Sequence, residues 1–242
     1  MKPIRIIHLF PELLNLYGDG GNVIVLRKRC EWRGIPVEVQ HVGMGDRLSL
    51  ADADIVILGG GADREQRMVC DSLLACRSEF SAYAADGGVM LAVCGGFQLL
   101  GHSYVLEDET LAGLGLVDME TVRGSSRLIG NAAIASSICD DPIIGFENHA
   151  GRTNLGPDVT PLGRTLAGTH GNNGSDGTEG ILSGNVMGTY LHGPLLPKNP
   201  QVADWLLVRA LGRRGQSPDV LHPLDDAAEI KANRTMRGRM GL

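Results

Sequence analysis

The feature that most constrains the fold is an apolar run that ends in a cysteine and two glycines. The run Val89–Val93 is followed by Cys94, Gly95 and Gly96, after which helical periodicity resumes. This pattern predicts a buried strand that turns sharply into a helix, with the cysteine on the turn. Such an elbow needs small residues two positions either side of the nucleophile, and here they are Ala92 and Gly96. We therefore expect Cys94 at the carboxyl end of a core strand.

Cys94 has a chemical and a purely structural interpretation. An isolated cysteine in an apolar run is most often a small buried side chain. Two glycines directly after it favour the chemical interpretation, because glycine weakens a helix start unless the backbone must approach another group. At the first turn of a helix, free N–H groups and the helix dipole favour the thiolate. The sequence therefore predicts that Cys94 is a nucleophile and that Gly95 offers an N–H to a developing oxyanion.

A thiolate nucleophile needs a base, and two of the seven histidines stand at suitable positions. His192 ends a short apolar stretch just before Gly193 and Pro194, where a sheet would fix its backbone while the side chain emerges at the rim. This position suits a general base. His149 lies at another predicted strand end and is equally compatible with a pocket residue and a structural histidine. We predict a Cys94–His192 pair.

A glycine cluster supplies the second candidate for oxyanion binding. Gly59, Gly60 and Gly61 follow the predicted strand 55–58. Glycine clusters after strands are often plain turns. Here the cluster stands where backbone N–H groups can point at a neighbouring site, and thioester formation needs two donors to the carbonyl oxygen. We predict that the N–H of Gly60 or Gly61 acts together with that of Gly95.

Apolar runs alternate with helical stretches in the first half of the chain. Strands are expected at 4–10, 37–42 and 55–58, with helices at 22–33 and 64–85. This order predicts an α/β fold with a mostly parallel sheet flanked by helices, in which active groups gather at the carboxyl ends of the strands. The stretch 18–21 lacks a complete phosphate-binding motif and is expected to be a tight turn before the next helix.

The second half is richer in strands. Beyond about residue 113 short strands and turns predict an antiparallel extension of the same sheet. A helix is expected at 202–211. The tail 217–242 is predicted to be helical over 223–236 and mobile over 237–242. All 242 residues are expected to form a single domain.

Composition narrows the function classes. The net charge of −6 and the lack of a basic patch with interleaved aromatics argue against nucleic-acid binding. No apolar run reaches the roughly 18 residues of a membrane-spanning helix. Five cysteines without a Cys-x-x-Cys pair indicate a reducing compartment and provide no zinc-site spacing. A cytoplasmic protein without a metal is expected.

The motifs together resemble a known family. The cysteine elbow, the glycine loop and the distal Tyr-Leu-His-Gly resemble a class I glutamine amidotransferase domain (flavodoxin-like) of the cobyric-acid-synthase-like branch. Four blocks are similar, in the same order, to the glutaminase subunits of lipid II isoglutaminyl synthases: 14–22, 59–66, 146–153 and 188–198. The resemblance covers nearly the whole chain.

The resemblance implies roles for further residues. Gln98, one helical turn past the nucleophile, would contact the bound glutamine. Asn148 and His149 would line the pocket, and Arg127 would bind the α-carboxylate of glutamine, although a solvated surface arginine is nearly as compatible with its position. A guanidinium fork matches a carboxylate well, which favours the binding role.

One departure from the family concerns the third catalytic group. Most class I domains carry a glutamate two residues after the histidine, whereas this chain has Pro194 there. A cysteine–histidine dyad can work without it, since cysteine depends least on full activation. Glu147, another residue of the chain, or an acid from a partner are the alternatives, and we favour a site influenced by a partner.

The resemblance also implies a partner. No ATP-binding motif is visible, so ammonia made by this chain would need a synthase to activate its acceptor. In the family that synthase is a Mur-ligase-like subunit, with ATP and Mg in the partner and no cofactor in this chain. The heterodimer would amidate the D-glutamate of lipid II at the inner face of the membrane, in peptidoglycan biosynthesis. A subunit serving a corrinoid acceptor, a non-catalytic scaffold and a cysteine hydrolase are the rival interpretations.

Overall fold

A six-stranded sheet forms the centre of the computed structural model, which describes residues 2–106 and 108–242. Its strand order is β11-β12-β4-β3-β1-β2. Five strands run parallel, namely β1 (Ile4–Leu9), β2 (Val37–Val42), β3 (Ile55–Leu58), β4 (Val89–Val93) and β12 (Val186–Thr189), and β11 (Ile181–Ser183) is antiparallel at one edge. Every residue of β3 and β4 is buried, as continuous aliphatic runs in a doubly covered sheet should be. The predicted parallel α/β fold is confirmed.

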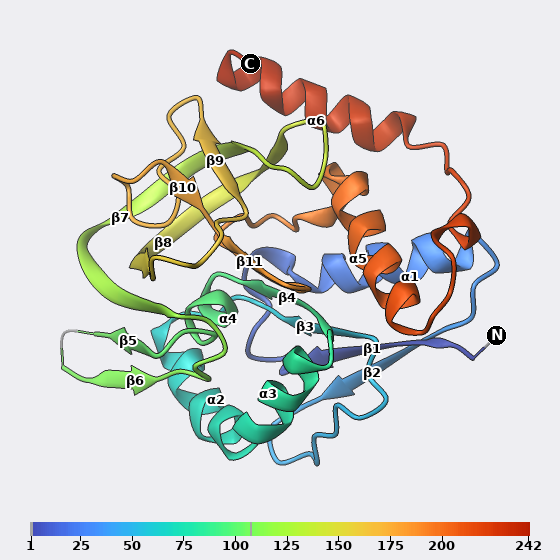
Figure 1. Ribbon diagram of the computed structural model, residues 1–242. Helices are drawn as coiled ribbons and strands as arrows, with labels where there is room; N and C mark the ends of the chain where they lie inside the picture. Colours follow the sequence, from blue (N-terminus) through green and yellow to red (C-terminus); the bar gives the residue numbers. More distant parts are fainter. Residues whose placement is uncertain (1, 107) are drawn as a thin grey trace.

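Helices cover both faces of this sheet. The helices α1 (Gly20–Glu31) and α5 (Pro200–Arg213) lie on one face, and α2 (Asp63–Ala75) and α3 (Arg77–Ala85) lie on the other (Figure 1). The single helix predicted for 64–85 is interrupted at Cys76, whose backbone leaves the helical region at φ −105° and ψ 12°. The sequence does not mark this break, because Cys76 is neither glycine nor proline. α5 begins two residues before the predicted helix 202–211 and ends two residues after it.

Most strands of the second half form a separate sheet. Its order is β10-β9-β7-β5-β6, and β8 pairs with β7. The strands are β5 (Ser103–Val105), β6 (Thr110–Ala112), β7 (Met119–Ala135), β8 (Ile143–Leu155), β9 (Gly163–Leu166) and β10 (Thr178–Glu179). The expected antiparallel extension of the first sheet is therefore limited to β11. Much of β7 is exposed, so this hairpin cannot continue a sheet that is buried on both faces.

The C-terminal tail packs against the rest of the chain. Helix α6 (Ala227–Met240) passes over the second sheet (Figure 1) and ends at Gly241 with φ 78°. Asn233 anchors it by donating to the carbonyls of Pro142 and Lys198, each at 3.1 Å. The helix begins four residues after the predicted start at 223 and continues to Met240, four residues past the predicted end at 236. Short 3-10 turns occupy Leu16–Gly18 (η1), Leu196–Lys198 (η2) and Pro218–Val220 (η3).

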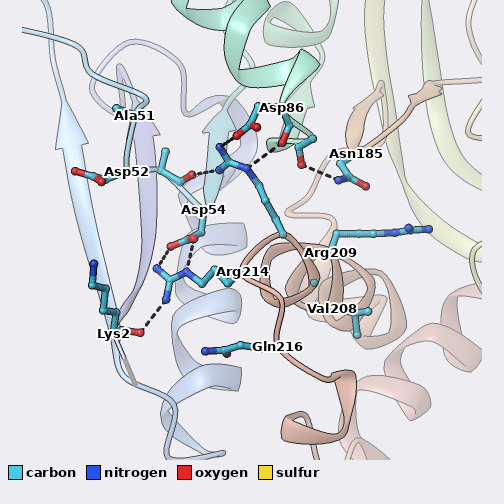
Figure 2. A pocket seen from close by; sticks show the side chains of 14 residues that line it. Lys2, Ala51, Asp52, Asp54, Asp86, Asn185, Val208, Arg209, Arg214 and Gln216 are labelled. Carbon is cyan, nitrogen blue, oxygen red and sulfur yellow. Dashed lines mark hydrogen bonds and ion pairs between the residues drawn. The ribbon is translucent and has the colours of Figure 1, made fainter.

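A cavity at the amino ends of the strands has a structural role. Figure 2 shows the ion pair between Arg214 and Asp54 at this cavity. A second ion pair joins Arg213 to Asp86. These bonds fasten the end of α5 to the loops before β3 and β4. None of the described residues that line it is a cysteine or a histidine. Among the residues described, no helix is long and apolar enough to cross a membrane.

Candidate active site

Cys94 stands on the predicted strand-to-helix elbow, between β4 and the short helix α4 (Gly95–Gln98). Its φ of 48° and ψ of −103° lie in a region that non-glycine residues rarely adopt. The Cys94 N–H donates to the Thr189 carbonyl at 2.8 Å, which ties the elbow to the end of β12. A Cβ on Gly96 would lie 2.6 Å from the Leu58 carbonyl oxygen, so this elbow requires glycine there.

His192 is brought to Cys94 by the sheet. It lies just past β12, which pairs in parallel with β4, so both side chains come to the same edge. Backbone bonds with Phe146 of 2.8 and 3.2 Å fix the His192 main chain, and the side chain is fully buried. Burial lowers the pKa of His192, but charge interactions and hydrogen bonds with Cys94 and Asp19 outweigh burial and raise this pKa to about 10. The imidazole is therefore held as a cation beside the sulfur.

Asp19 is a site residue that the sequence analysis missed. Its Oδ1 lies 3.7 Å from His192 Nδ1, and its Oδ2 accepts a hydrogen bond of 2.7 Å from the Gly60 N–H. The side chain is completely buried. We predicted only a tight turn before a helix here; Asp19 does precede α1, yet its side chain makes no capping bond. An acidic residue shortly after a parallel strand was the available signal.

The Glu147 carboxylate lies elsewhere. Its Oε1 accepts from the backbone N–H of His170 at 2.8 Å and is 2.6 Å from His170 Nδ1, while Oε2 accepts from the Gly171 N–H at 3.0 Å. The structure thus places Glu147 against the 170–171 loop instead of bringing it to His192. The acid that faces His192 comes from this chain, so the geometry does not require one from a partner.

Two of the three predicted oxyanion donors remain available. The Gly60 N–H donates to Asp19 Oδ2, which favours Gly61 of the two predicted alternatives. Among the described residues, the N–H groups of Gly61 and Gly95 have no acceptor. Gly60 is needed for space instead, because a Cβ there would lie 2.9 Å from His192 Cε1 and 3.2 Å from Cys94 Cβ.

A small cavity opens beside Cys94, and four of the predicted site residues line it: Gly61, Gln98, Arg127 and His149. The amide of Gln98 is held at both ends, donating to the Tyr190 hydroxyl at 3.2 Å and accepting from Gln66 Nε2 at 3.0 Å. Gln66 also lines the cavity, and its buried Oε1 has no hydrogen-bond donor. Sequence reasoning missed Gln66, because this residue belongs to α2 and only the packing of α2 against the elbow brings its side chain to the cavity.

His149 presents a neutral ring to the cavity. It stacks on Tyr190 with a centroid separation of 3.5 Å, and its Nδ1 lies 2.8 Å from the Gly151 carbonyl oxygen. Burial lowers the pKa of His149 to about 3. Since a carbonyl can only accept, the proton belongs on Nδ1, and the buried, unpartnered Nε2 is left as an acceptor.

Arg127 is oriented by Asn148 at the cavity wall. Its Nε donates to Asn148 Oδ1 at 2.6 Å and its Nη2 to the Asn148 carbonyl at 2.7 Å. With the described residues, Nη1 makes no such bond and stays available for an anion. Asn148 lies behind Arg127 and does not line the cavity itself. Among the described residues, no cluster of three or more histidine, cysteine, aspartate or glutamate side chains is arranged to hold a metal.

The elbow cysteine, the histidine from the neighbouring parallel strand and the covered sheet are features of class I glutamine amidotransferases. A solved structure supports this fold: PurLQS from Thermotoga maritima is similar with a TM-score of 0.61 and 20% identity, over 88% of this chain and 99% of that one. The chain has the class I glutamine amidotransferase fold.

Sequence comparison gives the family. The CobB/CobQ-like glutamine amidotransferase domain matches residues 5–200, and the chain belongs to this family of glutamine amidotransferases. It is 40% identical over 240 residues to the lipid II isoglutaminyl synthase (glutamine-hydrolyzing) subunit GatD of Staphylococcus aureus (strain N315), covering 99% of this chain and 97% of the relative. It is 36% identical over 171 residues to cobyric acid synthase of Brucella canis, covering 65% of this chain and 32% of that protein.

Proposed function

We propose that the chain is the glutaminase subunit of a lipid II-amidating synthase. It hydrolyses glutamine to glutamate and ammonia through a thioester on Cys94 and passes the ammonia to an ATP-dependent partner. The observation that carries the proposal is the juxtaposition of Cys94, His192 and Asp19 next to a cavity lined by Cys94 and Arg127.

The acylation step is proposed from the position of Cys94 beside His192, whose pKa is raised to about 10. The Cys94 thiolate attacks the side-chain carbonyl carbon of glutamine, and the oxygen takes up negative charge. The N–H groups of Gly61 and Gly95 donate hydrogen bonds to this oxygen and so stabilise its negative charge. Imidazolium His192 gives its proton to the departing nitrogen, so that ammonia leaves and a γ-glutamyl thioester remains.

The hydrolysis step reverses the direction of proton transfer. His192, now neutral, takes a proton from an attacking water molecule, whose oxygen bonds to the thioester carbon. The C–S bond then breaks, which releases glutamate and restores the thiolate beside an imidazolium. Asp19 stabilises that imidazolium and orients the ring through Nδ1, as the acid of a catalytic triad does.

Substrate recognition is assigned to the cavity wall. Nη1 of Arg127 would donate to the α-carboxylate, with the guanidinium held in place by Asn148. The α-ammonium would donate to acceptors that have no partner now, namely His149 Nε2 and Gln66 Oε1. Gln98 keeps Gln66 in place and also lines the cavity, and we propose that it contacts the bound glutamine.

The partner and the acceptor rest on the relatives. Ammonia serves a cell only when a second active site activates a carboxylate, so a Mur-ligase-like synthase with ATP and Mg is proposed as the partner in a heterodimer. The chain itself is proposed to need no cofactor. The GatD relative matches almost end to end, including α5 and α6, which favours lipid II over the corrinoid acceptor. We place the complex in the cytoplasm, at the inner face of the membrane.

The test is glutamate release from glutamine by the chain purified from its host with its partners retained, beside a Cys94→Ala variant. Release that depends on Cys94, with a Mur-ligase-like protein in the preparation, is expected. Release without that companion but with a corrinoid-amidating one would favour the rival acceptor. A folded, partnered chain that releases no glutamate would overturn the proposal and favour a scaffold.

A further inference from the structure

Tyr17 has an unusual conformation beside the proposed active site. It lies in η1 with φ 59° and ψ 20°, in the left-handed region that favours glycine, and the residue is 43% exposed. A non-glycine residue is kept in this region only where surrounding contacts hold it, and such strain concentrates at functional sites. No role proposed above uses Tyr17.

The ring of Tyr17 covers His192. The two ring centroids are 5.1 Å apart with an interplanar angle of 66°, and the Tyr17 ring also meets Phe146 edge-on at 5.7 Å. His192 is completely buried although Tyr17 beside it is half exposed. The partly exposed tyrosine ring is therefore packed against the buried imidazole.

The hydroxyl of Tyr17 points to the substrate-binding side. It accepts a hydrogen bond from Asn148 Nδ2, and the other end of that amide accepts from Arg127 Nε at 2.6 Å. The amide is bonded at both ends, so its orientation is fixed. A continuous series of contacts thus runs from Arg127 through Asn148 and Tyr17 to His192.

We infer that Tyr17 is a positioning residue that couples glutamine recognition at Arg127 to the placement of the His192 imidazole. Its hydroxyl acts through Asn148 on the arginine, and its ring acts on the histidine; it touches no reacting atom. The inference rests on the proposed roles of Arg127 and His192. It predicts that the two halves of the tyrosine side chain affect different kinetic constants.

Removing only the hydroxyl tests the first half. Tyr17→Phe keeps the ring over His192 but leaves Asn148 Nδ2 without its acceptor, which loosens Arg127. One neutral hydrogen bond corresponds to about a 3- to 10-fold effect, so we expect KM for glutamine to rise by that factor while kcat changes less than about twofold. In a double-mutant cycle with Asn148→Ala, the two effects should not add.

Removing the ring tests the second half. Tyr17→Ala opens His192 to water, which weakens its attraction to Cys94 and Asp19. We expect kcat to fall about 10-fold or more. The pH profile of Cys94 alkylation by iodoacetamide, followed on the Cys94 peptide by mass spectrometry, should also shift, whereas Tyr17→Phe should keep the wild-type profile.

Trp32→Ala is the matched control, because Trp32 is an exposed aromatic at the far end of α1. It should leave KM, kcat and the alkylation profile unchanged. The coupling would be overturned if Tyr17→Phe had the same KM as the Trp32→Ala control. Additive effects in the double-mutant cycle would overturn it as well. Neither result would affect the proposed glutamine hydrolysis by the wild type. Wild-type protein without Cys94-dependent hydrolysis would instead defeat the proposed function.

Discussion

Replacing Asp19 by asparagine removes one negative charge and little else. The asparagine amide retains an oxygen that can accept from the Gly60 N–H, so the loop that Asp19 holds should survive. The buried carboxylate lies 3.7 Å from His192 Nδ1. At an effective dielectric constant of about 20, two unit charges at this separation attract by about 4.5 kcal/mol, or about 3 pKa units.

The expected result follows from the sign of that attraction. The pKa of His192 is raised to about 10, and without Asp19 it should fall to about 7. The acylation step needs the imidazolium form, which is lost as pH rises through this pKa. The alkaline limb of kcat/KM should therefore move down by about 3 pH units, and at pH 8.5 the variant should lose roughly 30-fold against wild type.

The assay is the pH dependence of kcat/KM for glutamine hydrolysis between pH 6 and 10, with Cys94 alkylation followed over the same range. Asp71→Asn is the control, because it removes an exposed charge from α2. An Asp19→Asn protein whose alkaline limb coincides with that of the Asp71→Asn control would refute the assignment of Asp19 as the acid that acts on His192.

Three further substitutions have defined outcomes. Gly60→Ala places a Cβ 2.9 Å from His192 Cε1 and should lower kcat/KM at least about 100-fold; near-normal hydrolysis would show that this approach is not tight. Burial raises the pKa of Glu179 to about 8, so the stability it contributes is complete below about pH 4.5 and is lost as pH rises through about 8. The glutamine of Glu179→Gln can still accept from the Tyr190 N–H, so this variant should flatten the pH dependence of the free energy of urea unfolding between about pH 4.5 and 8. A pH dependence equal to that of the wild type would contradict this prediction. Arg214→Ala leaves the buried Asp54 with fewer partners and should cost about 2–3 kcal/mol in urea unfolding with unchanged KM, and a loss under about 0.5 kcal/mol would contradict the structural role.

The sequence was sufficient to predict the parts of the site that the backbone fixes. Continuous aliphatic runs identified β4 and its neighbours, and the glycines after Cys94 identified the elbow. The apolar stretch before His192 then placed the histidine at the same edge, because parallel strands end together. These inferences depend on local patterns and on one rule of sheet topology.

The parts that were missed depend on contacts between loops that are distant in the sequence. Asp19 and Tyr17 reach His192 from the loop after β1, and the sequence of that loop reads as an ordinary turn. Glu147 was considered as the third catalytic group because it lies near His149 in the sequence. Its hydrogen-bond partners are in the 170–171 loop, and no local sequence pattern predicts that this loop packs there. The same limitation explains the second sheet, since the pairing of β7 with β8 is set by packing.

The central claim is that Cys94 carries the glutamyl group during turnover. The most direct test is acid quenching of the partnered protein during glutamine hydrolysis, followed by mass spectrometry of the Cys94 peptide. We predict an adduct equal to glutamine minus ammonia on Cys94 that disappears when glutamine is exhausted, and neither adduct nor turnover with Cys94→Ala. Hydrolysis that persists in the Cys94→Ala protein, or an adduct on another residue, would contradict the account.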